Sequence, residues 1–352
     1  MKNLERQSNI ELLRILSILG VIVLHYNNKT IGGGFQFVTG NSLNYYFLMI
    51  LESICICAVD LFMLISGYFS CFSKKTVLNK PFKLIVQVIF FSFSWNFITG
   101  ILNRSVSIKA LLYSLIPANY FVILYITVYL LSPYLNLVYE KMSCCFIFLI
   151  FLIFSIYPTF VDVFSQITGG NWLGLSTIGM YGSQWGYQIV NFIMMYYIGM
   201  YIRKNKLKLD GIKSIYVFLF FCIIAFLITL WSCLSQFLGF DRNLAWSYCN
   251  PLVVLEAIVV FILFLKVKIG CIKFINKFSA ATFTTFLAHT FFISYINIKW
   301  AVQQNIVILI CHILISSIAI YFLCYILYLI YDSIFKIVFK KIDKKNIVIT
   351  QL

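Results

Sequence analysis

Charged residues are scarce in this chain: 11% of its 352 residues are Asp, Glu, Lys or Arg, whereas 62% are hydrophobic. A soluble globular protein has about 25% charged and about 45–50% apolar residues. One globular core of this size cannot hide the excess of apolar side chains, so a lipid bilayer must solvate much of the surface. The composition therefore predicts an integral membrane protein of the all-α class.

The sequence also lacks the usual patterns of metal and disulfide sites. None of its eleven cysteines forms a CxxC pair, and none of its three histidines stands at a zinc-finger interval from a cysteine. We interpret the cysteines as small apolar core residues and expect no metal site. No Ser nucleophile elbow and no phosphate-cradling Gly loop is present, which leaves a general base or an acyl carrier as the chemistry open to a histidine.

Long apolar runs are abundant, and crossing about 30 Å of hydrocarbon takes about 17–25 residues. We predict ten transmembrane helices at residues 10–26, 46–70, 82–102, 118–139, 144–164, 185–202, 215–238, 251–267, 280–298 and 306–335. The fourth and ninth runs are interrupted by polar residues. No cleavage site of the A-x-A type follows the first run, so it is expected to stay as a helix. Residues 1–352 are expected to form one transmembrane domain without an appended soluble domain.

The positive charges are unevenly distributed along the chain. Lys and Arg number 27 against 11 Asp and Glu, which gives a net charge of +16. If the N-terminus is inside and the spans alternate, 21 of the 27 lie in inner segments, five lie in outer segments, and Arg14 lies within the first span. The positive-inside rule predicts this distribution for a membrane protein with both termini in the cytoplasm. The basic balance therefore requires no nucleic-acid partner.

Ionisable side chains inside a span are costly, at about 2.5–3.5 kcal/mol each, and are candidates for function. They are few here: Arg14, His25, Glu52, Asp60, Glu256, His289 and His312. Asp60, Glu256, His289 and His312 are each open to two interpretations, as a hydrogen-bonded packing group or as part of a shared site.

Arg14 and His25 have the most informative spacing. Eleven residues turn a helix only ~20° past three full turns and advance it by ~16 Å, so both side chains project from one face. They could line a channel through the membrane. Alternatively, Arg14 could reach the inner surface in a pair with Glu11, and His25 could cap the outer end.

Three outer loops, at residues 27–45, 162–184 and 240–250, are also open to two interpretations. They could cover a pocket that faces outward, or they could be plain connectors.

Several motifs, in order along the chain, resemble the acyltransferase type 3 family of bacterial membrane proteins, which includes surface-polysaccharide O-acetyltransferases. Arg14 and His25 resemble its Arg-x10-His signature, and Ser66-Gly67-Tyr68 its second-helix motif. Further similarities lie at residues 119–136, 197–203 and 283–289. The sequence departs from the family pattern in two places. Phe286 stands where the last of these motifs usually has Tyr. Lys74 and Lys75 stand where an Arg pair often follows the Ser-Gly motif, and lysine lacks the planar guanidinium fork of arginine.

The resemblance implies transfer of an acyl group, most often acetyl, from cytoplasmic acyl-CoA to a sugar hydroxyl outside. His25 would be the base or transient acyl acceptor, and Arg14 would hold the donor. The remaining candidates for donor or substrate binding are Asp60, Ser66, Lys74, Lys75, Glu256 and His289. The expected partners are acetyl-CoA as a donor substrate, a polysaccharide or lipid-linked glycan as acceptor, and polysaccharide-biosynthesis proteins. No permanently bound cofactor is expected, and the expected location is the bacterial plasma membrane.

Two other classes are alternatives. A polysaccharide polymerase or lipid-linked sugar flippase is also basic, polytopic and rich in aromatic residues. A polymerase usually has a long outer loop rich in Arg, whereas the largest outer loop here, after Asp162, contains no Lys or Arg. A flippase would favour more spans and a larger charged cavity. The second alternative is a membrane scaffold without catalytic activity.

Overall fold

The protein is a bundle of helices in a computed structural model, which describes residues 6–117, 119–170, 172, 184–345 and 348–350. Within these residues, eight helical segments are long and apolar enough to cross a membrane. They are α1 (Ser8–Asn27), α3 with α4 (Leu43–Cys55, Ala58–Ser70), α5 (Asn79–Leu102), α7 (Tyr120–Glu140), α8 to α9 (Cys144–Phe151, Tyr157–Thr168), α12 (Ser214–Phe237), η3 with α13 (Arg242–Trp246, Pro251–Lys266) and α17 (Ile306–Lys345). The prediction of an all-α polytopic membrane protein is confirmed.

The remaining elements are short. A π-helical turn, Leu152–Ile156, joins α8 to α9, and an antiparallel ladder pairs β1 (Lys75–Val77) with β2 (Val348–Thr350). The other short elements are α2 (Gly34–Phe37), α6 (Ile108–Tyr113), η2 (Gln184–Gly186), α11 (Lys206–Asp210), α14 (Lys273–Phe278), η4 (Ser279–Ala281) and α16 (Ile298–Ala301).

Two of the ten predicted spans are shorter than predicted. The sixth span becomes α10 (Ile189–Lys204, 16 residues), because Trp185 and Gly186 adopt positive φ angles of 58° and 75° that do not continue a helix. The ninth becomes α15 (Thr282–Ile293, 12 residues). Its predicted C-terminal part turns instead, and the Asn297 side chain caps α16 by accepting from the Trp300 N–H.

Two other spans differ from prediction in continuity and length. The second is broken between α3 and α4 rather than continuous. The tenth extends past Phe335 to Lys345, and Lys83 on α5 forms an ion pair with Asp343 in the extension, at 2.7 Å.

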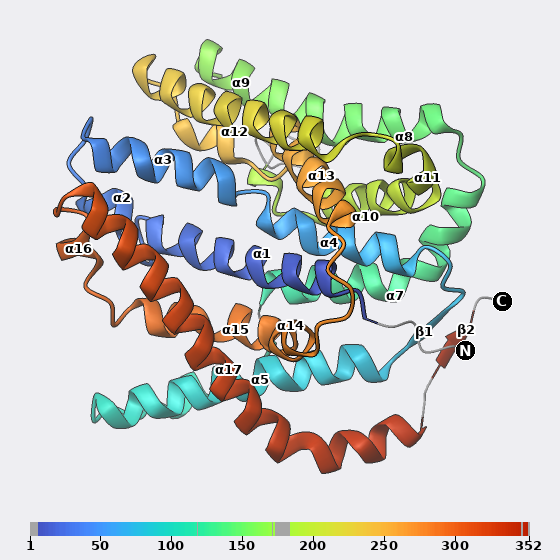
Figure 1. The fold of residues 1–352 in the computed structure, drawn as a ribbon. Coiled ribbons are helices and arrows are strands. Elements are labelled where there is room, and N and C mark those ends of the chain that lie inside the picture. The colour runs from blue at the N-terminus through green and yellow to red at the C-terminus, as the bar shows by residue number, and fades with distance from the viewer. Residues whose placement is uncertain (1–5, 118, 171, 173–183, 346–347, 351–352) are drawn as a thin grey trace.

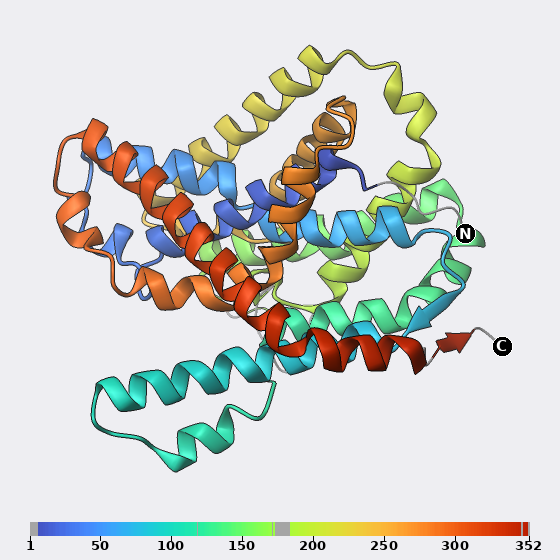
Figure 2. The ribbon, with the colours of Figure 1, turned by 60° about the horizontal axis from the view of Figure 1, so that its bottom comes forward.

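Helix α1 runs through the middle of the bundle (Figure 1). It packs against α3, α4, α13, α14, α15 and α17. The second half of α5 and the short α6 project from the other helices (Figure 2), and side chains there are largely exposed and apolar, as lipid contact requires. The start of α1 and the end of α17 lie at the same end of the bundle (Figure 1).

Helices α4 and α10 form the most extensive helix contact, and two glycines make it possible. A Cβ atom on Gly67 would lie 2.0 Å from the Tyr196 carbonyl oxygen, and one on Gly199 would lie 2.3 Å from that of Leu64. Small residues allow membrane helices to approach this closely. The Ser-Gly-Tyr and Tyr-x-Gly motifs therefore have a structural basis, namely the reciprocal packing of α4 against α10.

Candidate active site

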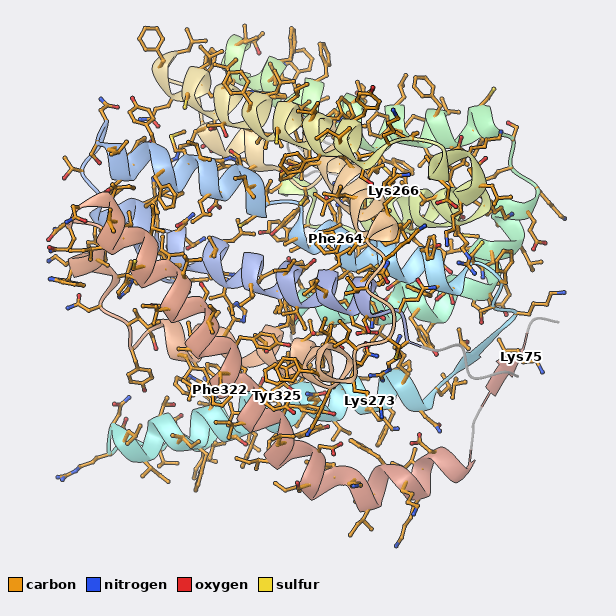
Figure 3. All side chains as sticks on the ribbon, viewed as in Figure 1. Lys75, Phe264, Lys266, Lys273, Phe322 and Tyr325 are labelled. Atoms are coloured by element: carbon orange, nitrogen blue, oxygen red, sulfur yellow. The ribbon has the colours of Figure 1, made fainter. Side chains whose placement is uncertain are left out.

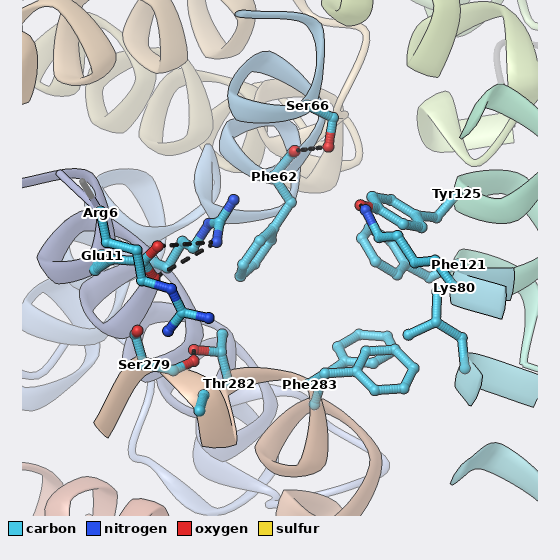
Figure 4. A pocket seen from close by; sticks show the side chains of 14 residues that line it. Arg6, Glu11, Phe62, Ser66, Lys80, Phe121, Tyr125, Ser279, Thr282 and Phe283 are labelled. Carbon is cyan, nitrogen blue, oxygen red and sulfur yellow. Dashed lines mark hydrogen bonds and ion pairs between the residues drawn. The ribbon is translucent and has the colours of Figure 1, made fainter. Parts of the chain in front are cut away.

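A cavity of about 290 Å³ lies at the end of the bundle where α1 begins, the end that the charge distribution predicts to face the cytoplasm. We call it the inner cavity. Figure 4 shows Arg6 and Glu11 on one side of it and Lys80 with Tyr125 on the other. Its remaining lining is Arg14, Phe62, Ser66, Leu84, Phe121, Ser279, Ala280, Thr282, Phe283 and Phe286.

The three cations of the inner cavity are held in different ways. Arg14 Nη1 lies 3.3 Å from Oε1 of Glu11, the i,i+3 pair considered from the sequence. Lys80 Nζ donates to the Tyr125 hydroxyl at 2.8 Å. Arg6 Nη1 donates to the Asn276 carbonyl at 3.1 Å. Glu11 is the one carboxylate among the described residues that line this cavity, so the lining presents an excess of positive charge to a ligand.

A second cavity of about 530 Å³ contains His25, and we call it the outer cavity. Asn28, Asn119 and Asn243 supply amide groups to its wall, and Glu52 supplies a carboxylate that accepts from Asn27 Nδ2 at 2.8 Å. Its aromatic lining is Tyr120, Trp185, Tyr187, Trp246, Tyr248 and Phe286. The wall therefore combines planar apolar faces with hydrogen-bonding groups, the usual make-up of a small-molecule site.

His25 is hydrogen-bonded to a second histidine. His289 Nε2 lies 2.7 Å from His25 Nδ1, and His289 Nδ1 lies 2.8 Å from the Thr285 carbonyl oxygen. A carbonyl oxygen only accepts, so His289 Nδ1 carries the proton and its Nε2 accepts when the ring is neutral. His25 Nδ1 must then be the donor. This chain leaves Nε2 of a neutral His25 unprotonated, the state that a base or nucleophile needs.

The two cavities meet at one side chain. Phe286 on α15 lines both the inner and the outer cavity. Arg14 lines the inner cavity and His25 the outer one, so the two residues on one face of α1 line two different cavities that share this aromatic ring. The spacing that suggested a path across the membrane thus corresponds to two cavities with Phe286 between them.

The other candidate residues from the sequence separate into two groups. Ser66 lines the inner cavity and donates to the Phe62 carbonyl at 2.8 Å, and His289 lines the outer cavity. Lys74 and Lys75 are exposed at β1 and line neither cavity. Their proposed contact with the donor stays a prediction.

Asp60 and Glu256 are buried between helices instead of lining either cavity. Asn191 Nδ2 donates to Asp60 Oδ1 at 3.1 Å, which links α10 to α4. Glu256 on α13 lies near the thiol of Cys57 at the break between α3 and α4. These positions favour packing roles.

Two of the three outer loops contribute to the outer cavity. Asn28 comes from loop 27–45, and Asn243, Trp246 and Tyr248 come from loop 240–250. Most of loop 162–184 falls outside the described residues. The polar and aromatic composition of loop 240–250 was the sequence signal for this wall of the outer cavity.

No sequence signal identified Phe286 as a residue shared by the two cavities, or Arg6 and Lys80 as cations of the inner cavity. Among the described residues, no group of three or more His, Cys, Asp or Glu is placed to hold a metal ion.

The bundle belongs to a membrane acyltransferase, because residues 7–329 match the family model described as an acyltransferase domain. The chain is a member of the acyltransferase type 3 family, as its motifs predicted. No curated protein and no solved structure matches it.

Proposed function

We propose that the protein moves an acyl group, acetyl in the first instance, from acyl-CoA in the inner cavity to a hydroxyl group of a glycan in the outer cavity. The observation that carries the proposal is the placement of Arg14 and His25 in two cavities that share Phe286. The glycan is a cell-surface polysaccharide or its lipid-linked precursor, and the membrane is the bacterial plasma membrane.

The lining of the inner cavity suits the acyl end of the donor. Arg14 and Lys80 attract a polyanionic donor and orient it, while Phe62, Phe121 and Phe283 offer apolar contact to the pantetheine arm. The arm passes Phe286 to bring the thioester carbonyl to His25. No permanently bound cofactor takes part in this scheme, because acyl-CoA is a substrate that leaves as CoA.

His25 Nε2 acts as the base. It accepts the proton of the acceptor hydroxyl while that oxygen forms a bond to the thioester carbonyl carbon. The carbon–sulfur bond then breaks, and His25 returns the proton to the departing CoA thiolate, so the products are an ester and free CoA. In a second route, Nε2 attacks the thioester carbonyl carbon, the carbon–sulfur bond breaks, and CoA leaves as the thiolate. The acceptor hydroxyl then attacks the acyl carbon, the carbon–nitrogen bond breaks, and the hydroxyl proton passes to the CoA thiolate, so the products are again an ester and free CoA. Both routes require the unprotonated Nε2 that the hydrogen bond to His289 leaves available.

The outer cavity supports a sugar as acceptor. Its volume of about 530 Å³ is that of a small-molecule site. Amide groups such as those of Asn28 and Asn243 donate to and accept from hydroxyl groups, and Trp246 and Tyr248 provide flat apolar surface with a polar edge. A polysaccharide polymerase or flippase is less well supported, because the family match is to an acyltransferase domain.

The test is acyl transfer by the purified protein in proteoliposomes, with labelled acetyl-CoA and glycan from the producing strain. We expect His25→Ala to reduce transfer by at least about 100-fold, the usual contribution of a general base. His312→Gln is the matched control, because His312 contacts Tyr26 at 2.8 Å and lines neither cavity. Normal transfer by a folded His25→Ala protein would exclude the catalytic assignment.

A second experiment tests the glycan. NMR of the surface polysaccharide from a deletion strain should show fewer O-acyl signals than that of the parent strain. Unchanged O-acyl signals together with altered chain length would favour the polymerase instead.

A further inference from the structure

A third cavity, separate from the inner and outer cavities, opens at the end of the bundle where α1 begins. Its volume is about 760 Å³. It lies between the start of α1, the connection from α11 to α12 and the connection from α13 to α14. Figure 3 shows Lys266, which lines it, at the end of α13, well away from Lys75 at β1.

Positive charge dominates the wall of this cavity. Among the described residues, its lining holds five cations and the single carboxylate of Asp210; the cations are Arg6, Lys206, Lys213, Lys266 and Lys268. Lys266 Nζ donates to the Leu209 carbonyl at 2.6 Å, a contact that leaves the charge uncompensated. Within the described residues, none of the five cations forms a salt bridge. A concave surface with several uncompensated cations attracts a ligand with multiple negative charges.

The backbone at the start of α12 adds to the positive electrostatic potential of this cavity. Helix α12 begins at Ser214, which lines the cavity together with Lys213, and its N-cap Lys213 makes no side-chain capping bond in the described part of the chain. The Tyr216 and Val217 N–H groups donate to the Lys213 carbonyl, so the start of α12 presents the backbone of Ser214 to the cavity wall. The positive end of the helix dipole at that position favours an anion.

Arg6 lines both this cavity and the inner cavity, so the two cavities are neighbours at the start of the chain's first helix. A ligand with its acyl end in the inner cavity would reach the cationic cavity by passing Arg6. The wall also contains apolar side chains, Leu265 and Val267 among them, against which a base can pack. The volume falls within the range of sites for cofactor-sized ligands.

We propose that this cavity binds the phosphorylated nucleotide end of acyl-CoA, with Lys206, Lys213 and Lys268 as its phosphate-binding residues. The inference rests on the proposed function, in which acyl-CoA is the donor. It extends that function by assigning a nucleotide subsite distinct from the acyl site at Arg14.

Binding measurements on the full-length protein in nanodiscs test the subsite without depending on turnover. The probe is adenosine 3′,5′-bisphosphate, which has the adenosine, the 3′-phosphate and the first 5′-phosphate of the nucleotide end but no thiol. We expect the triple variant Lys206→Gln, Lys213→Gln, Lys268→Gln to bind it at least about tenfold more weakly than wild type, because charge-assisted hydrogen bonds are lost. The control is Lys336→Gln, Lys340→Gln on α17, two exposed lysines that line none of these cavities.

Transfer assays with two donors complete the test. The triple variant should have a raised KM for acetyl-CoA and an unchanged KM for acetyl-pantetheine, which lacks the nucleotide. Equal nucleotide binding by wild type and triple variant would overturn the subsite, even if acyl transfer is normal. Absence of transfer by the wild type from either donor would instead overturn the proposed function.

A further arm distinguishes the nucleotide from an anionic lipid headgroup, which has similar phosphate chemistry. The binding experiment is repeated in nanodiscs of neutral lipid and of neutral lipid with phosphatidylglycerol. If the triple variant loses only the retention of phosphatidylglycerol and binds the nucleotide like wild type, the cavity holds a lipid and the proposal is wrong.

Discussion

His289 Nε2 lies 2.7 Å from Nδ1 of His25, although the two residues are 264 positions apart. The Thr285 carbonyl fixes the proton on the far nitrogen of His289, and that proton in turn determines which nitrogen of His25 is free. In the proposed mechanism, His289 would therefore act on the reaction through His25, as a positioning residue. A hydrogen bond to the second nitrogen of a catalytic histidine commonly sets its tautomer and ring orientation.

The first prediction concerns this pair. His289→Leu removes the imidazole acceptor that contacts His25 Nδ1, and we expect kcat to fall at least about tenfold, while the KM for acyl-CoA stays nearly unchanged. His289→Gln supplies a side-chain oxygen as a replacement acceptor and should retain more activity than His289→Leu. Steady-state kinetics in proteoliposomes measure both parameters. If the Leu and Gln variants had the same kcat as wild type, His289 would be a packing residue only.

The second prediction concerns Phe286, which lines both the inner and the outer cavity. Phe286→Ala would merge the two cavities and admit water to the thioester. We therefore expect the ratio of CoA released to acyl groups transferred to rise several-fold, because water competes with the acceptor hydroxyl. Phe283→Ala is the control, since Phe283 lines the inner cavity alone. An unchanged ratio in Phe286→Ala would show that Phe286 does not separate the two compartments.

The third prediction concerns the packing of α4 against α10. A Cβ atom at Gly67 would overlap the Tyr196 carbonyl, so Gly67→Ala should destabilise the protein by about 1–3 kcal/mol through overpacking. Thermal unfolding in detergent should show a lower Tm for this variant. Gly40→Ala is the matched control, because a Cβ atom there meets nothing within 4 Å. A Tm for Gly67→Ala equal to that of the control would contradict the close-packing explanation of the Ser-Gly-Tyr motif.

Most of the fold was predictable because the bilayer imposes a length on each apolar run. The interruptions were not predictable, since hydropathy describes a segment as a whole. The break between Cys55 and Ala58 lies in an apolar stretch, and α15 ends at Ile293 where the apolar run continues to Ile298. In both places, backbone geometry and local hydrogen bonds decide where the helix ends.

The site was predictable where one helix contains both partners. Arg14 and His25 share α1, so helix periodicity alone placed them on one face. The contact between His25 and His289 depends on how α15 packs against α1, and periodicity does not determine the rotation of one helix against another. The same reason explains why Phe286 was noted in the sequence only as a departure from a motif. Its position between two cavities is a property of the packed bundle.

The fourth prediction distinguishes the roles of Arg14 and Glu11, two neighbours on α1 that have opposite charges. Arg14 and Glu11 form an ion pair at 3.3 Å, and both line the inner cavity. If that cavity receives the donor, Arg14→Gln removes a cation that attracts it, and the KM for acyl-CoA should rise at least about tenfold. Glu11→Gln removes a carboxylate that repels the donor and leaves Arg14 free to bind it, so the KM should fall.

Initial rates at varied acyl-CoA and fixed acceptor measure this difference in sign. Arg104→Gln is a suitable control, because Arg104 follows α5 at the opposite end of the bundle and lines none of the three cavities. Loss of the ion pair alone would destabilise both variants in the same direction. A rise in KM for Glu11→Gln equal to that for Arg14→Gln would therefore mean that the pair stabilises α1, and that Arg14 does not contact the donor.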